Sequence, residues 1–151
     1  TEKEKIKSEL LRKFKFIDYV EYHYISAKNE TGIKYLIKKI NAIMKSLNID
    51  SSTTHITGML QEIISKHPPK VVQGRRIKLR YMHLAKTNPI RFIIHGNQTK
   101  NIPDSYKRYL CKAFRKKLKL LATPVLIEFK QNKNPYVKKE GIRKKGEKKY
   151  N

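Results

Sequence analysis

The chain has 151 residues, which is enough for one ordinary core or two small ones. Its 36 Lys and Arg against 12 Asp and Glu give a net charge of +24, so we expect a polyanionic partner or a solvated tail. Hydrophobic residues make up 38%, which excludes disorder throughout. The single cysteine, Cys111, excludes an internal disulfide, and no apolar run has transmembrane length. We therefore expect no membrane partner and a cytoplasmic location.

Residues 1–50 carry little of the excess charge, with 11 basic and 7 acidic side chains against 25 and 5 in residues 51–151. The polar stretch NIDSS at residues 48–52 indicates a boundary at residue 50. Apolar spacing predicts helices over residues 2–14 and 33–47. Residues 20–25 are rich in β-branched and aromatic side chains, which predicts a strand between them. We expect this helix–strand–helix unit to be too small to close a core on its own.

A third helix is predicted after the boundary, capped by Ser51 or Ser52 and ended by Pro68 and Pro69. Gly58 within this helix costs about 1 kcal/mol relative to alanine, which tertiary packing must offset. The apolar residues follow i, i+3, i+4, i+7 and i+8 spacing: Ile56, Met59, Leu60, Ile63 and Ile64.

Two strands of a hairpin are predicted next. Residues 76–84 (RIKLRYMHL) alternate, which places Leu79 and Tyr81 on one face and Met82 on the other. Residues 91–95 (RFIIH) form the partner strand, and the turn between the two contains Asn88 and Pro89.

A last helix is predicted with Asp104 or Ser105 as its cap, followed by a strand over residues 125–129. The predicted fold class is therefore α+β, with the order α-β-β-α-β and two helices covering one face of a three-stranded sheet. Residues 133–151, with 8 basic and 2 acidic side chains, are expected to be a basic disordered tail. The apolar stripe of the last helix is Tyr106, Leu110, Phe114, Leu118 and Leu121.

Several short motifs of the second half occur together. Their combined order and spacing is a specific signal, which no single one of these short motifs would provide. They are HPP at 67–69, GRRIKLRYMH at 74–83, NP at 88–89, IHGNQ at 94–98, PDSYKRYL at 103–110, FRK at 114–116, TP at 123–124 and NPY at 134–136. This set resembles the C-terminal domain of the Der (EngA) family, bacterial GTPases with two tandem G domains followed by a KH-like domain. Residues 12–33 are similar to the end of the second G domain.

The resemblance implies three parts: residues 1–50 as a remnant of an α/β P-loop GTPase domain, residues 51–132 as the KH-like domain, and residues 133–151 as the tail. It also implies a role in biogenesis of the large ribosomal subunit, with ribosomal RNA and a G domain of the same protein as partners. The alternative is a free-standing basic RNA-binding module unrelated to GTP, for which residues 1–50 would be dispensable.

Ser26, Ala27 and Lys28 match the loop with which such G domains contact the guanine base. In that loop a main-chain N–H donates to the guanine O6, which adenine does not offer. The chain has no P-loop, switch region or magnesium site. We therefore expect no catalytic residue, no hydrolysis and no useful GTP affinity from this chain alone, although the resemblance implies GTP and Mg²⁺ in the intact family.

The basic side chains of the KH-like part favour RNA, because Glu62, Asp104 and Glu128 are the only acids between residues 51 and 132. No Gly-x-x-Gly spacing occurs, so we expect phosphate and shape recognition rather than a base clamp. Tyr106 and Tyr109 could stack on bases, but core packing is the favoured interpretation for Tyr106, and Tyr109 is left open between the two. No metal-ligand spacing is present. The candidate RNA-binding residues are Arg75, Arg76, Lys78, Arg80, Lys107, Arg108, Lys112, Arg115, Lys116 and Lys119.

Overall fold

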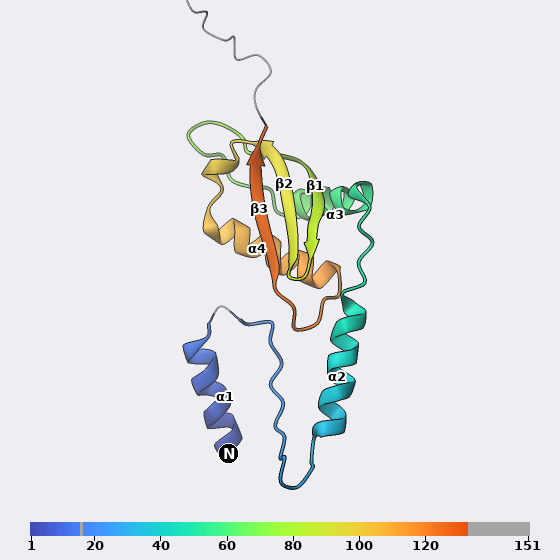
Figure 1. Cartoon of the computed structure of the whole chain (residues 1–151). Coiled ribbons are helices and arrows are strands. Elements are labelled where there is room, and N and C mark those ends of the chain that lie inside the picture. Colours follow the sequence, from blue (N-terminus) through green and yellow to red (C-terminus); the bar gives the residue numbers. More distant parts are fainter. Residues whose placement is uncertain (16, 133–151) are drawn as a thin grey trace, which may run out of the picture.

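The structure is a computed structural model, which describes residues 1–15 and 17–132. The tail predicted at residues 133–151 lies outside the described residues. None of the described helices has the length and apolar character that a bilayer crossing requires. The elements are α1 (Glu2–Lys13), α2 (Ile33–Ser46), α3 (Thr53–Lys66), β1 (Lys78–Thr87), β2 (Ile90–Asn97), the 3₁₀ helix η1 (Thr99–Asn101), α4 (Asp104–Lys117) and β3 (Val125–Gln131) (Figure 1).

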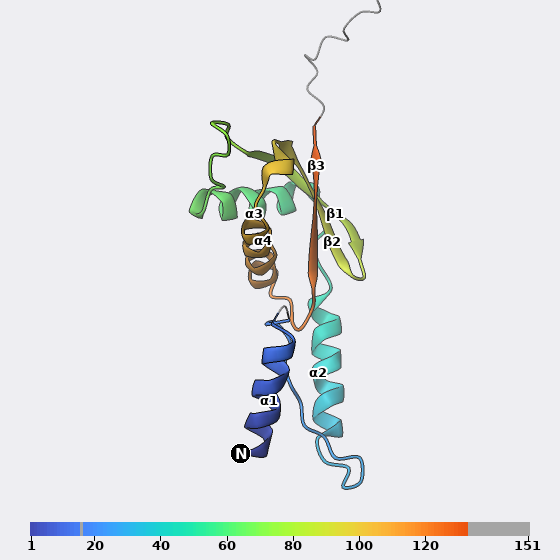
Figure 2. The ribbon, with the colours of Figure 1, turned by 90° about the vertical axis from the view of Figure 1, so that its left-hand side faces the viewer.

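The three strands form one mixed sheet in the order β1-β2-β3. β1 and β2 pair antiparallel as the predicted hairpin, and β3 pairs parallel to β2 because α4 carries the chain back across the sheet. α3 packs against β1 and α4 against β3, and both helices lie on the same side of the sheet (Figure 2). The predicted α+β fold, with the order α-β-β-α-β, is confirmed.

One hydrophobic core joins the two helices to the inner face of the sheet. The rings of Phe92 and Phe114 meet at its centre, 5.6 Å apart. Fully burying a side chain of this size contributes about 1.5–3 kcal/mol. Among the residues that the structure describes, all buried apolar side chains lie between Ile56 and Val125, so the core belongs to the part that was predicted to fold around the sheet.

The predicted alternation along β1 is wrong beyond Leu79. A β-bulge at Arg80 inserts one extra residue into β1 between the Leu79 and Tyr81 pairs with β2. Met82 therefore enters the core with 0% exposure, whereas Tyr81 turns to the other face of the sheet and is 40% exposed. A strict period of two, read from the sequence, cannot contain this extra residue.

The first part of the predicted stripe of α4 is buried, but the helix ends before the stripe does. Lys119 has a φ of 53°, which takes the chain out of the helical path after Lys117. Leu120 rather than Leu121 consequently enters the core. The N-cap residue is Pro103, not Asp104 or Ser105. The buried stripe residues are Tyr106, Leu110 and Phe114.

Residues 1–50 form no core of their own, as predicted: neither α1 nor α2 contains a buried residue. The predicted strand at residues 20–25 is wrong. This segment runs between α1 and α2 (Figure 1), and only an isolated bridge joins Ser26 to Thr31. A strand needs a hydrogen-bonding neighbour, and the described residues provide none beside it. Large apolar side chains are left at 40% exposure or more: Ile6, Leu11, Phe14, Tyr24, Ile25, Tyr35, Ile37, Ile40 and Met44.

Candidate nucleic-acid interface

α4 carries the largest group of the predicted RNA-binding residues. Arg108, Lys112 and Lys116 follow one another at a spacing of four residues, so they form one row on the helix, and all three are exposed. Lys107 lies beside this row, where its Nζ is 3.3 Å from the Asp104 carboxylate. The solvent face of α4 therefore presents a row of three cations to a partner.

An acidic residue from the first part of the chain reaches α4. The carboxylate of Asp18 accepts hydrogen bonds from Lys112 Nζ at 3.3 Å and from an Arg115 Nη at 3.5 Å. The guanidinium of Arg115 also lies 4.4 Å from the centroid of the Tyr19 ring, and its side chain is only 15% exposed. Arg115 therefore anchors residues 18 and 19 on α4. Sequence reasoning missed this contact because Asp18 lies 97 residues away along the chain.

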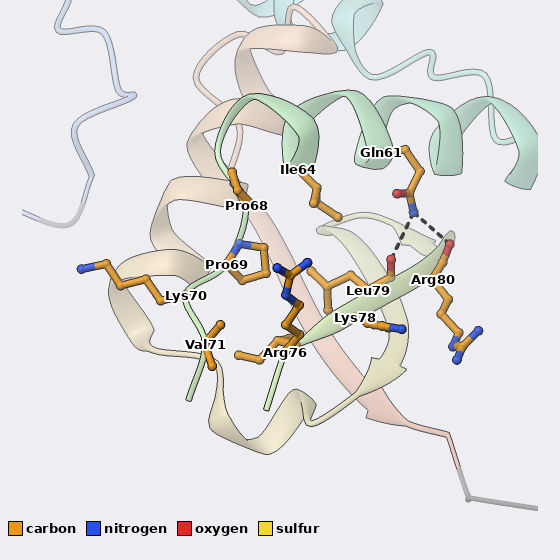
Figure 3. A pocket seen from close by; sticks show the side chains of 11 residues that line it. Gln61, Ile64, Pro68, Pro69, Lys70, Val71, Arg76, Lys78, Leu79 and Arg80 are labelled. Carbon is orange, nitrogen blue, oxygen red and sulfur yellow. Dashed lines mark hydrogen bonds between the residues drawn. The ribbon is translucent and has the colours of Figure 1, made fainter. Parts of the chain in front are cut away.

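Arg75, Arg76, Lys78 and Arg80 lie in β1 and the turn before it, apart from α4, whereas Lys119 is exposed just after the end of α4. A groove of about 710 Å³ runs between the end of α3, the loop that follows it, and β1 (Figure 3). Its lining is apolar at Ile64, Pro68 and Pro69. Arg75 is exposed in the adjoining turn. The basic residues along the groove are Lys70, Arg76, Lys78 and Arg80.

α3 covers part of the free edge of β1. The side-chain amide of Gln61 donates hydrogen bonds to the carbonyl oxygens of Leu79 and Arg80, at 3.1 and 3.0 Å (Figure 3). The Thr57 hydroxyl donates to the Met82 carbonyl and accepts from the Met82 N–H, both at 3.1 Å. Because these main-chain groups are already bonded, this stretch of edge does not offer a template for an incoming strand. The groove offers apolar contact and cations instead.

The three acids of residues 51–132 are all engaged in ion pairs. Glu62 pairs with Lys66 and Lys117, Asp104 with Lys107, and Glu128 with Arg91. The hydrogen bond from Lys117, supported by that from Lys66, holds the pKa of Glu62 below its usual value. Of the 17 Lys and Arg in this part, 11 have no carboxylate partner among the described residues. They are Lys70, Arg75, Arg76, Lys78, Arg80, Lys86, Lys100, Arg108, Lys116, Lys119 and Lys130.

The predicted guanine-base loop lies at the opposite end of the molecule from the sheet (Figure 1). The Ser26 N–H donates to the Thr31 carbonyl at 3.0 Å, and the Thr31 N–H donates to the Ser26 carbonyl at 3.1 Å. Ala27 and Lys28 are exposed in the turn between them. The structure therefore does not bring Ser26, Ala27 and Lys28 together with the cations of α4 or β1.

Two predicted stacking residues pack inside the fold. Tyr106 is buried, as the favoured prediction of core packing held, and its hydroxyl donates to the His67 carbonyl at 2.8 Å. Burial raises the pKa of Tyr106 to about 12. The Tyr109 hydroxyl donates to the Ile63 carbonyl at 3.4 Å. Burial also raises the pKa of the Cys111 thiol, which disfavours the nucleophilic thiolate. The part of the chain that the structure describes holds no group of three or more metal-ligating side chains.

Comparison with known proteins decides the family. The family described as the KH-domain-like part of EngA bacterial GTPase enzymes, C-terminal, matches residues 51–130, which is more than half of the chain. The chain belongs to the Der (EngA) family. It is 46% identical over 135 residues to GTPase Der of Pseudomonas putida (strain W619), a match that covers 89% of this chain and 28% of that protein.

Other Der relatives match over the same extent. GTPase Der of Aeromonas hydrophila is 44% identical over 134 residues, and GTPase Der of Hahella chejuensis is 41% identical over 139. These matches cover 89% and 92% of this chain, but 27% and 29% of the relatives. The chain thus spans less than a third of the length of the Der proteins that it matches, and it corresponds to their C-terminal part.

One cluster of the Der-type KH-like fold escaped the sequence analysis. Tyr81, His83 and His95 stack on the face of the sheet that the helices leave uncovered. The bulge at Arg80 brings Tyr81 to this face. The only signal in the sequence was the presence of aromatic side chains in both strands of a hairpin, which does not reveal on which face they meet.

Proposed function

We propose that this chain is the RNA-contacting C-terminal part of a Der-type GTPase that acts in biogenesis of the large ribosomal subunit, in the cytoplasm. The observation that carries the proposal is the surplus, in residues 51–132, of 11 cations that have no carboxylate partner in the described part of the chain. Such a surface attracts a polyanion, and the release of counterions from RNA phosphates drives the binding. Ribosomal RNA is the partner that best suits this surface.

We further propose that residues 1–50 are the end of a G domain, joined to a KH-like domain over residues 51–132. The apolar side chains of α1 and α2 support this, because a patch of this kind marks a surface for another part of a protein. In this arrangement Ser26, Ala27 and Lys28 contact the base, while phosphates and Mg²⁺ are bound by segments outside this chain. The isolated chain is then expected to show no GTP binding at micromolar nucleotide.

The alternative of a free-standing RNA-binding module treats residues 1–50 as dispensable. Several contacts weigh against it. Leu47 and Ile49 pack against the core of the KH-like part, and Asp18 pairs with α4. The Leu121 N–H also donates to the Ser46 hydroxyl at 3.3 Å. Deleting residues 1–50 should therefore lower the stability of what remains.

The experiment is a salt titration of the affinity for ribosomal RNA fragments, with the full chain. A triple variant, Arg108→Gln, Lys112→Gln and Lys116→Gln, removes the exposed row on α4 without touching the core. The slope of log K against log salt should fall by about 2 to 3, since each phosphate contact contributes roughly 0.7–0.9. The matched control is Lys34→Gln, Lys38→Gln and Lys45→Gln on α2, three exposed lysines that carry the same total charge.

The control should retain most of the affinity and slope of the unaltered chain. Equal losses in both triple variants would mean that only net charge matters, and the assignment to α4 would be wrong. No RNA binding by the unaltered chain at low ionic strength would refute the proposed function itself.

A further inference from the structure

The face of the sheet opposite the helices is uncovered. Figure 2 views the sheet nearly edge-on, with both helices on one side and none of the described elements against the other. Side chains alternate along strands, and Phe92 and Ile94 are buried on the helix side, so the register identifies the residues of the uncovered face. They are Lys78, Tyr81, His83 and Lys86 of β1, Arg91, Ile93, His95 and Asn97 of β2, and Leu126, Glu128 and Lys130 of β3.

Three flat rings form a ladder at the centre of this face. The rings of Tyr81 and His95 are 4.3 Å apart between centroids and inclined by only 7°. His83 continues the ladder, 5.3 Å from His95 and inclined by 26°. His95 occupies one face of the Tyr81 ring, and the side chain is nevertheless 40% exposed, so its other face is open to solvent.

The middle ring of the stack, the imidazole of His95, favours its neutral form. Burial, the neighbouring His83 and the charge of Lys130 lower the pKa of His95, and a hydrogen bond with Asn132 opposes them only in part. Its Nε2 is buried and has no hydrogen-bond partner among the described residues. The imidazole therefore supports the Tyr81 ring by stacking rather than acting as a cation.

Cations surround the ladder on both edges of the sheet. Lys78 and Lys86 on β1 and Lys130 on β3 have no carboxylate partner among the described residues. Arg80 also reaches this face, where its Nε donates to Asn97 Oδ1 at 3.2 Å. The single acid of the face, Glu128, is paired with Arg91.

This composition fits RNA better than a protein. The buried centre of a protein–protein interface is depleted of charged residues, lysine in particular, whereas here the rings are surrounded by lysines and arginines. Bases stack on aromatic side chains while cations hold the adjoining phosphates. A base in the interior of a duplex has both of its faces covered by its neighbours, so that, away from duplex ends, only an unpaired base can stack on Tyr81.

We propose that the uncovered face of the sheet is a second RNA-binding surface, which takes an unpaired base on the open ring face of Tyr81 and the flanking phosphates on Lys78, Arg80 and Lys130. The inference rests on the proposed function, because both take RNA as the ligand. It adds a second binding surface and a preference for single-stranded RNA, which the row on α4 does not provide. The row on α4 contacts phosphates of either single-stranded or duplex RNA, whereas the sheet selects single strands.

The test compares two fluorescent RNAs, a short poly(U) strand and a longer blunt duplex in which few base pairs are terminal, binding to the full chain at one salt concentration. Tyr81→Ala should weaken poly(U) binding by about tenfold, the typical effect of removing one stacking ring, and leave the duplex affinity unchanged. Tyr81→Phe, which keeps the ring, should bind both RNAs like the unaltered chain. A strand containing 4-thiouridine should photo-crosslink to the peptide that carries Tyr81, a readout that does not depend on how well the Ala variant folds.

The outcomes separate this inference from the proposed function. Binding of the duplex but not of poly(U) by the unaltered chain, or an equal loss of both in Tyr81→Ala with an unchanged thermal transition, refutes the sheet surface alone. If Tyr81→Ala binds both RNAs with unchanged affinity and no crosslink forms at this peptide, the uncovered face does not bind RNA. The inference would then be wrong, and a protein partner would be the remaining candidate for this face. Failure of the unaltered chain to bind either RNA refutes both proposals.

Discussion

Replacing Gly96 by alanine should strongly destabilise the KH-like fold. Gly96 is buried in β2 and lies opposite Leu79, next to the bulge. A Cβ at this position would stand 2.1 Å from the carbonyl oxygen of Lys78 and 3.1 Å from the Leu79 Cα. Both atoms belong to the backbone, so a side-chain rotation cannot relieve the clash. β1 would have to move away from β2 by about 1.3 Å or more, the gap between 2.1 Å and an ordinary contact of about 3.4 Å.

Overpacking that displaces backbone costs about 3 kcal/mol, the upper end of the usual range. For a fold of this size, a loss of that order lowers the melting temperature by about 12–24 °C. The measurement is thermal unfolding followed by circular dichroism, with urea unfolding to obtain the free energy. Because β1 also carries Lys78 and Arg80, the variant should lose affinity for RNA as it unfolds.

Gly58 provides the matched control. It lies in α3, is exposed, and has nothing within 4 Å of the place where a Cβ would stand. Gly58→Ala should therefore stabilise the fold, by up to about 1 kcal/mol, through helix propensity alone. A Gly96→Ala variant as stable as the unaltered chain would refute the close packing of β1 on β2. Equal destabilisation by both substitutions would show that the effect is not specific to this contact.

Two further predictions concern charge. Asp18→Asn removes the carboxylate that Lys112 and Arg115 share, so RNA affinity should rise and its salt dependence steepen. The free energy of unfolding should change by about 1 kcal/mol or less, because the Asp18 side chain is 51% exposed and Lys112 is 74% exposed, although Arg115 is not. An unchanged salt slope would contradict the pairing. His95 has a lowered pKa in the folded state, so the unfolded state binds its proton more readily and stability should fall as the pH drops below about 6.5. The fall is complete below the lowered folded pKa. Thermal unfolding between about pH 7 and pH 5 measures it, and His95→Phe, which keeps a ring in the stack, should remove this part of the pH dependence.

The elements of the second half could be predicted because each carries its own local pattern. The spacing of Ile56, Met59, Leu60 and Ile63 identifies the buried face of α3 whatever that face packs against, and all four are buried. The charge excess is likewise a property of composition. The predicted strand at residues 20–25 failed for the opposite reason, since β-propensity describes a segment that fits into a sheet and does not supply the sheet.

The amino-acid sequence by itself therefore determined the α-β-β-α-β order, the family, and the excess of positive charge over negative. Only the tertiary structure decided where that charge is displayed. It pairs Asp18 with Lys112 and Arg115 across 94 and 97 residues, and separates the row on α4 from the cations of β1. The bulge at Arg80 turns Tyr81 onto the uncovered face, because one extra residue in one strand reverses the facing of the residues that follow. Pairings of this kind depend on segments far apart in the chain, and no local pattern contains them.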